Sequence, residues 1–250
     1  MTTASHVEAE LQAQLELARQ VQLSLLPHRS CCLSGWDVAF SYEAAGVVSG
    51  DYVDLIPAGP EAFYFALGDV SGKGIAASIL MSHLHATLRA LLPLNWPIEE
   101  VMTKASHTFC ESTLPAQFAT LVLGRAASDG NVELVNAGHT PVLIVDDAGV
   151  QVIPAASLPL GMFCSTDFTS VKRTLNAEGM LFLYSDGIAE SADEAGNEYD
   201  LNRLVETVGQ LRGRPSSEVV EIIRNQIVAY TNGARAADDR TMLALHYPAF

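Results

Sequence analysis

Positive charge and long apolar runs are both scarce in this sequence. It holds 14 Lys and Arg against 29 Asp and Glu in 250 residues, which gives a formal net charge of −15. A chain without clustered basic residues is poorly suited to nucleic acid or anionic membranes, so we expect neither as a partner. We find no apolar run of the roughly 18 residues that a membrane helix needs. Residues 1–10 are polar and acidic, unlike a secretory signal. We therefore expect a cytoplasmic protein.

Cysteine is scarce too, and its spacing is uninformative. The four residues are Cys31, Cys32, Cys110 and Cys164, with no C-x-x-C pair. This pattern indicates neither a zinc framework nor an evident disulfide scaffold. Four cysteines could form two disulfides, but without an export signal we expect all four to be reduced thiols.

The first segment of the chain is predicted to be a helix over residues 6–26 that Pro27 ends. Apolar or uncharged positions recur in steps of four and three, at Leu11, Leu15, Ala18, Gln22 and Leu25. The pattern fits a short coiled-coil seam, and equally a lone amphipathic helix packed on its own domain. We therefore divide the chain into residues 1–30, a helix and linker that could serve dimerisation or regulation, and residues 31–250, one folded domain.

The rest of the chain alternates blocks of strands with helices. Period-two patterns and turn signals predict strands at 36–42, 52–56, 62–67, 118–124, 132–136, 142–145, 150–153, 168–175, 180–184 and 241–247. Apolar spacing predicts helices at 74–92, 97–111, 201–210 and 216–230. Tight turns between strands favour antiparallel sheets. The sequence therefore predicts an α+β fold in which two antiparallel β-sheets form a sandwich flanked by helices, preceded by an N-terminal helix.

Aspartates stand at the ends of several predicted strands: Asp51, Asp69, Asp186 and the pair Asp238-Asp239. A turn at 58–61 would place Asp51 opposite residue 68 and hence beside Asp69. Two carboxylates at that distance repel each other unless a cation lies between them or one is protonated. Hard divalent cations prefer such oxygen ligands. The competing interpretation is that these residues only mark turns.

At this point the residues resemble a known family, the SpoIIE/RsbU-type branch of the metal-dependent protein phosphatases related to protein phosphatase 2C. The ordered motifs cover most of the chain: ARQVQLSLLP at 18–27, GDY at 50–52 with Asp54, GDVSGKG at 68–74, FATL at 118–121, NAGHTP at 136–141, PLG at 159–161, YSDGI at 184–188 with Glu190, and DDRT at 238–241.

The resemblance implies a centre with two divalent cations, Mn²⁺ or Mg²⁺, in a catalytic domain over residues 31–250. Asp69 would bridge the two cations, with the Val70 carbonyl as a further ligand. Asp51 would serve one cation, and Asp186 and Asp238 the other. Asp69 and Asp186 would thus be the catalytic aspartates, and the first Asp of the 238–239 pair is the one that aligns with the family ligand.

The resemblance also implies a reaction and a partner. Metal-activated water would attack phosphoserine or phosphothreonine of a STAS-type anti-sigma-factor antagonist in a partner-switching pathway. Lys73 could steer the substrate phosphate or be a solvated surface residue. The stretch that carries a His in protein phosphatase 2C holds Ser71 and Lys73 here, so the general acid is unassigned. The alternative is a non-catalytic partner-binding module of the same fold. A separate activator could act at the N-terminal helix, or the helix could form a homodimer.

Overall fold

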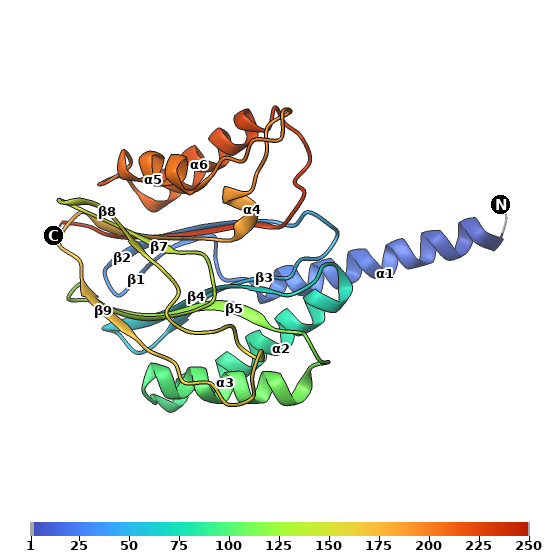
Figure 1. Cartoon of the computed structure of the whole chain (residues 1–250), viewed down its shortest axis with the longest axis horizontal. Helices are drawn as coiled ribbons and strands as arrows, with labels where there is room; N and C mark the ends of the chain where they lie inside the picture. Colours follow the sequence, from blue (N-terminus) through green and yellow to red (C-terminus); the bar gives the residue numbers. More distant parts are fainter. Residues whose placement is uncertain (1–2, 250) are drawn as a thin grey trace.

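Two stacked antiparallel sheets form the body of the molecule in the computed structural model, which describes residues 3–249 (Figure 1). The outermost residues of the expected segments 1–30 and 31–250 (1–2 and 250) lie outside the described part. One sheet has the strand order β1 (Ser30–Leu33), β2 (Trp36–Glu43), β11 (Arg240–Tyr247), β10 (Gly179–Tyr184), β7 (Val142–Asp146) and β8 (Gly149–Ile153). The other has the order β3 (Asp51–Pro57), β4 (Ala62–Val70), β5 (Ala119–Ala127), β6 (Asn131–Ala137) and β9 (Val171–Thr174).

Helices cover the outer face of each sheet. The five-stranded sheet is covered by α2 (Ile75–Leu91), the short 3-10 segment η1 (Leu92–Leu94) and α3 (Ile98–Ser112). The six-stranded sheet is covered by α4 (Asp186–Ala189), α5 (Leu201–Gly209) and α6 (Ser216–Tyr230). Each layer of helices buries its own apolar cluster against the sheet beneath it. The predicted α+β sandwich is therefore confirmed.

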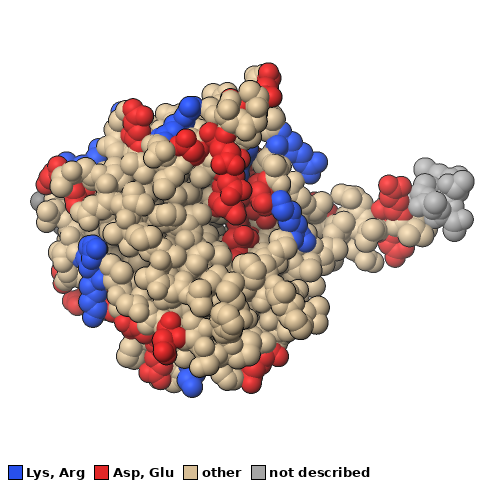
Figure 2. Space-filling model, in the orientation of Figure 1, with Lys and Arg blue, Asp and Glu red and all other residues tan. Residues whose placement is uncertain are grey.

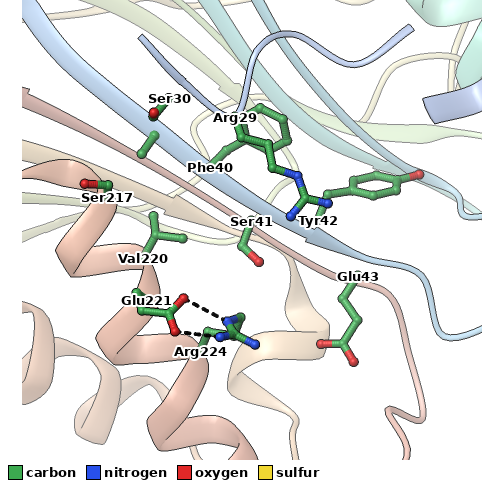
Figure 3. A pocket seen from close by; sticks show the side chains of 11 residues that line it. Arg29, Ser30, Phe40, Ser41, Tyr42, Glu43, Ser217, Val220, Glu221 and Arg224 are labelled. Atoms are coloured by element: carbon green, nitrogen blue, oxygen red, sulfur yellow. Dashed lines mark hydrogen bonds and ion pairs between the residues drawn. The ribbon is translucent and has the colours of Figure 1, made fainter. Parts of the chain in front are cut away.

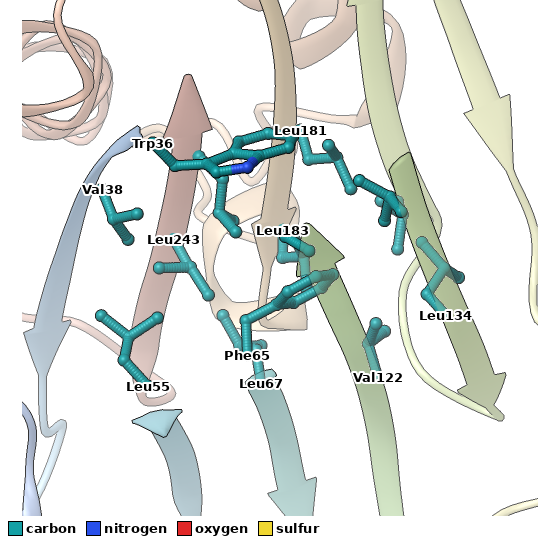
Figure 4. Close-up of a cluster of buried hydrophobic side chains, with 14 of the residues drawn as sticks. Trp36, Val38, Leu55, Phe65, Leu67, Val122, Leu134, Leu181, Leu183 and Leu243 are labelled. Carbon is teal, nitrogen blue, oxygen red and sulfur yellow. The ribbon is translucent and has the colours of Figure 1, made fainter. Parts of the chain in front are cut away.

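The core between the sheets consists of side chains from alternate strand positions (Figure 4). Trp36, Phe65, Leu67, Leu183 and Leu243 are at most 1% exposed. Because side chains alternate across a strand, the residues between them point outward under the helices or toward the end of the sandwich. This alternation limits the possible registers of each strand and therefore which strand ends can meet.

The observed elements differ from the predicted ones at a few points. The structure adds β1 and α4, which have only four residues each. The β3–β4 loop is one residue longer than predicted, since Pro57 pairs with Phe63, and so Asp51 pairs with Asp69 rather than with residue 68.

The segment Ile75–Leu94 is long and apolar enough to cross a membrane, by length and composition alone, which corrects the expectation that no stretch is long enough. In the structure one face of this segment, including Met81, packs on the five-stranded sheet.

Two of the cysteines are paired, contrary to the expectation of four reduced thiols. Cys110, near the end of α3, forms a disulfide with Cys164, with their Cα atoms 5.3 Å apart. The loop that carries Cys164 folds back over α3, where the Gly161 amide donates a hydrogen bond to Ser106 Oγ (3.2 Å). The two cysteines lie 54 positions apart, so their spacing gave no sign of this contact. Cys31 and Cys32 are free.

The N-terminal helix, α1 (Thr3–Leu25), projects from the body of the molecule (Figure 1). Leu11 is 53% exposed, whereas Gln22 is 5% exposed and contacts the domain. The Gln22 side chain donates to the Ser49 carbonyl (2.8 Å) and accepts from the Ser49 amide (3.0 Å). The proposed seam therefore divides: its last turns pack on this domain, and its first turns do not.

Candidate metal centre

The predicted aspartates meet at one edge of the sandwich. Asp51 opens β3 and pairs with Asp69, the penultimate residue of β4. Asp186 follows β10 and opens α4, and Asp238 lies just before β11. Figure 2 shows acidic side chains gathered in a band on this face, near the side from which α1 projects. Two sheets thus contribute to a single acidic site.

Hydroxyl groups hold the Asp51 carboxylate, which is 1% exposed. Ser185 Oγ donates to Asp51 Oδ2 at 2.9 Å, and Thr241 Oγ1 donates to the same oxygen at 2.5 Å. Among the described residues Asp51 Oδ1 accepts no hydrogen bond. One oxygen is therefore fixed by the six-stranded sheet while the other can serve a ligand.

The carboxylates at this edge disfavour one another's charge. Burial, and then the neighbouring Asp186, Asp238 and Asp239, raise the pKa of Asp69 to about 7. Burial and the charge of Asp69 raise the pKa of Asp51 well above its usual range. Burial and Asp238 raise the pKa of Asp186 as well. Bound cations would remove this repulsion, because each carboxylate would then face an opposite charge.

Glycine at position 50 leaves room for two oxygen atoms. A Cβ atom there would lie 3.0 Å from the Val70 carbonyl oxygen and 3.2 Å from Asp69 Oδ1. Both distances are tighter than ordinary carbon–oxygen contacts, so a side chain would press on the two atoms expected to bind a cation. The close approach of the main chain explains why glycine precedes Asp51.

The structure distinguishes Asp238 from Asp239 by what each holds. Both oxygens of Asp239 accept main-chain amides, from Ala45 (2.8 Å) and Gly50 (2.9 Å). Asp238 Oδ2 instead lies 2.7 Å from Lys73 Nζ, and both of these side chains are partly exposed. Asp239 therefore holds the loop before β3, and this geometry favours Asp238 as the ligand.

The donor set fits hard cations that retain water. The candidate ligands are all oxygen atoms, which suit Mg²⁺ or Mn²⁺ rather than softer metals. Within residues 3–249, no group of three or more His, Cys, Asp or Glu side chains is arranged to hold a metal ion by itself. Cations here would complete their coordination with main-chain oxygen and water, as Mg²⁺ commonly does.

The match to a family model decides which family this is. The model described as Stage II sporulation protein E (SpoIIE) matches residues 59–248, which is most of the chain. The chain belongs to the SpoIIE family. Among curated proteins, this SpoIIE-family chain is 28% identical to protein IcfG of Synechocystis sp., over 93% of the chain and 41% of that protein. It is 27% identical to phosphoserine phosphatase RsbP of Bacillus subtilis, over 71% of the chain and 45% of that protein. The chain thus spans less than half the length of either relative.

Solved structures show the same fold. The SiaA-PP2C domain of Pseudomonas aeruginosa has a TM-score of 0.85 at 18% identity, covering 98% of this chain and 99% of that one. The catalytic domain of the serine threonine protein phosphatase PstP, a complex with two manganese ions, has a TM-score of 0.63 at 15% identity, covering 84% and 97%. The SpoIIE-family chain therefore has a protein phosphatase 2C-type fold.

Some residues at this site had no role in the sequence analysis. Ser185 and Thr241 lie within the quoted motifs, but only the structure shows both hydroxyls on one Asp51 oxygen. From the sequence, Asp239 is only a possible metal ligand. Its hydrogen bond with the Gly50 amide joins residues 189 positions apart, which no local pattern indicates. His139, in the NAGHTP motif, is buried, and its Nδ1 lies 2.8 Å from Thr120 Oγ1.

Proposed function

We propose that this SpoIIE-family domain is a metal-dependent protein serine/threonine phosphatase. The observation that carries the proposal is the convergence at one edge of Asp51 and Asp69 from β3 and β4 with Asp186 from α4 and Asp238 from the segment before β11, with raised pKa values for the first three. Such a site is unfavourable as a bare acidic cluster and well suited to binding cations.

We propose that the site takes two divalent cations, Mn²⁺ or Mg²⁺. When bound, these cations would activate water near neutral pH and neutralise charge on the phosphoryl oxygens. Asp69 would lie between them with the Val70 carbonyl beside it, Asp51 would serve one cation, and Asp186 and Asp238 the other. Ser185 and Thr241 would hold Asp51 in place by their two hydrogen bonds.

Lys73 is proposed as a substrate-positioning residue. Its ammonium group lies against Asp238 and also donates to the Ala237 carbonyl at 3.2 Å, so it stands at the rim of the site. The positive charge of Lys73 at this position would attract a phosphorylated side chain.

As substrate we propose a phosphorylated STAS-type anti-sigma-factor antagonist in a partner-switching pathway. We propose that the enzyme acts on it in the cytoplasm. The proposal is supported by membership of the SpoIIE family and by the similarity to RsbP, a phosphoserine phosphatase.

An assay of p-nitrophenyl phosphate hydrolysis tests the proposed phosphatase activity. It compares the wild type with Asp69→Asn, each with and without Mn²⁺. Mn²⁺-dependent turnover that Asp69→Asn abolishes is expected. If turnover and calorimetric Mn²⁺ binding are both absent, the chain is a non-catalytic partner-binding module. A purified phospho-STAS protein then tests the substrate, and an active enzyme that leaves it phosphorylated rules out that substrate.

We propose that α1 receives a second copy of the chain or a separate activator. Exposed apolar side chains on α1 include Val7, Leu11, Leu17 and Val21. Leu17 and Val21 also line a cavity of about 380 Å³ with Ile79 of α2. Leu17→Asp is expected to lower the mass seen by light scattering or the response to an activator. An unchanged mass and unchanged activity would contradict this role.

A further inference from the structure

Basic side chains gather beside the proposed metal centre, although the chain as a whole is strongly acidic. A cavity of about 300 Å³ next to Asp238 is lined by Lys73, Arg235 and Arg240, with Glu190 also in its wall. Asp238 lines the cavity too, so its wall holds three basic and two acidic side chains in a chain whose net charge is −15. Such a cavity would attract an anionic group toward the site.

Arg240 is the most unusual of these residues. It is 6% exposed, and its closest carboxylate is that of Glu43 at 4.0 Å, beyond hydrogen-bond distance. The Arg240 side chain donates no hydrogen bond to any residue in the described part of the chain. A guanidinium has five N–H donors, and no Arg240 nitrogen is among the fully buried, unpartnered atoms of the described residues, so these donors face the cavity and its solvent. Because Arg240 lines the cavity, an acceptor that enters it could satisfy these donors.

The basic residues continue away from the metal centre. A small cavity of about 10 Å³ has Arg240 and Arg224 in its wall, and it shares Arg224 and Glu43 with a cavity of about 550 Å³. This larger cavity lies between α6 and β2, and Arg29 reaches into it from the segment before β1 (Figure 3). We call Arg235, Arg240, Arg224 and Arg29 the arginine row.

Residues of the arginine row that already donate hydrogen bonds keep further N–H donors for an acceptor. Arg224 is already paired with Glu221, through hydrogen bonds of 2.6 and 3.2 Å. Arg235 donates to the Ala45 carbonyl at 2.9 Å and is otherwise exposed. Serine hydroxyls from Ser30, Ser41 and Ser217 also line the larger cavity and could bind main-chain or carboxylate oxygen.

We propose that the arginine row binds an acidic segment of the substrate protein next to its phosphorylated residue, with Arg240 receiving the carboxylate nearest the metal centre. This inference rests on the proposed phosphatase function and adds a sequence preference to it. Most of the remaining surface of a chain with net charge −15 would repel such a segment. Another basic cavity, lined by Arg125, Lys172 and Arg173, belongs to the other sheet, so the arginine row is the basic surface next to the metal centre.

The test compares two phosphoserine peptides that differ only in whether Asp and Glu or Ala flank the phosphoserine. For the wild type with Mn²⁺, kcat/KM should be about ten-fold higher for the acidic peptide, as expected for one charge-assisted hydrogen-bonded pair. In Arg240→Gln and in Arg224→Gln the ratio should fall to about two or less, and Arg240→Lys should restore part of it. Arg173→Gln, the same charge change on β9 of the other sheet, should keep the wild-type ratio.

The outcomes separate this inference from the proposed function. Equal kcat/KM for both peptides in the wild type, or an unchanged ratio in folded Arg240→Gln, would overturn the arginine row while leaving the phosphatase intact. If neither peptide is hydrolysed, the p-nitrophenyl phosphate assay decides the proposed function, and anisotropy of the labelled acidic peptide tests the row independently of turnover. Tighter binding of the acidic peptide to wild type than to Arg240→Gln supports it, and equal binding refutes it. Arg224→Gln keeps the test valid if Arg240→Gln does not fold.

Discussion

Replacing Asp69 by Asn should stabilise the protein when metal is removed. Burial and three neighbouring carboxylates raise the pKa of Asp69 from 3.8 to about 7. Each pKa unit corresponds to 1.36 kcal/mol. Ionising Asp69 in the folded protein therefore costs about 4 kcal/mol more than in the unfolded chain, as an upper bound, because the repulsion is shared among several groups. A neutral Asn of the same shape should recover about 2–4 kcal/mol of this cost.

The sign of the pH dependence follows from the raised pKa. The folded state binds the Asp69 proton more tightly than the unfolded state does, so stability falls as pH rises from about 4 to about 7. The advantage of Asp69→Asn should therefore be small near pH 4 and fully developed at pH 8. Urea denaturation in EDTA at both pH values measures it.

Metal should reverse the order of stability. Mn²⁺ adds about 4.1 kcal/mol at a concentration one thousand times Kd, which exceeds the advantage of the variant, provided that only the folded state binds it. The wild type should gain this stability, and Asp69→Asn should gain little. If Asp69→Asn is no more stable than the wild type in EDTA at pH 8, the account of the carboxylates as a repulsive cluster is wrong.

Three further substitutions test the surroundings of the site. Asp239→Ala should lower the free energy of unfolding by about 1–3 kcal/mol, because two main-chain amides lose their acceptor; urea denaturation measures this, and an effect below about 0.5 kcal/mol would contradict it. Gly187→Ala should greatly reduce the yield of folded protein by circular dichroism, since its Cβ would lie 2.2 Å from the Asp239 carbonyl oxygen; a native spectrum would show that α4 can shift. Arg89→Met should cost about 2–4 kcal/mol, because it removes the charge and the two hydrogen bonds of 2.7 and 2.8 Å that Arg89 donates to the fully buried Asp54 carboxylate. Adding Asp54→Asn should recover part of this loss in a double-mutant cycle, and strictly additive effects would argue against a coupled pair.

The sequence was sufficient for the fold wherever a local pattern carried the signal. Period-two alternation located β2 and β11, and apolar spacing located α6 between Ser216 and Tyr230. Elements of four residues, such as β1 and α4, offer too few positions for a period to be seen. The β3–β4 hairpin was identified, but its register was off by one because loop length depends on turn geometry, which the pattern does not fix.

The site was predictable only as far as residue type and motif reach. The aspartates could be chosen because carboxylates at strand ends suit hard cations. The hydrogen-bond partners of those aspartates could not be predicted, because Thr241 and Asp51 are 190 positions apart in the sequence. The Cys110–Cys164 disulfide was missed for the same reason, since it depends on a loop folding back over α3.

The position of β11 has a consequence for how the protein folds. This strand lies between β2 and β10, to which it pairs along its length, although nearly the whole domain separates it from β2 in sequence. Until β11 is in place, β2 and β10 expose the edges that it will join, and unpaired edges invite association with other chains. Closure of this sheet is a high-contact-order step and should be slow. Since Asp238 directly precedes β11, and β11 also brings Thr241 to Asp51, the acidic site is complete only after that step. Before it, the β3–β4 hairpin can bring together only Asp51 and Asp69, so an unfinished chain carries only part of the repulsion among its carboxylates.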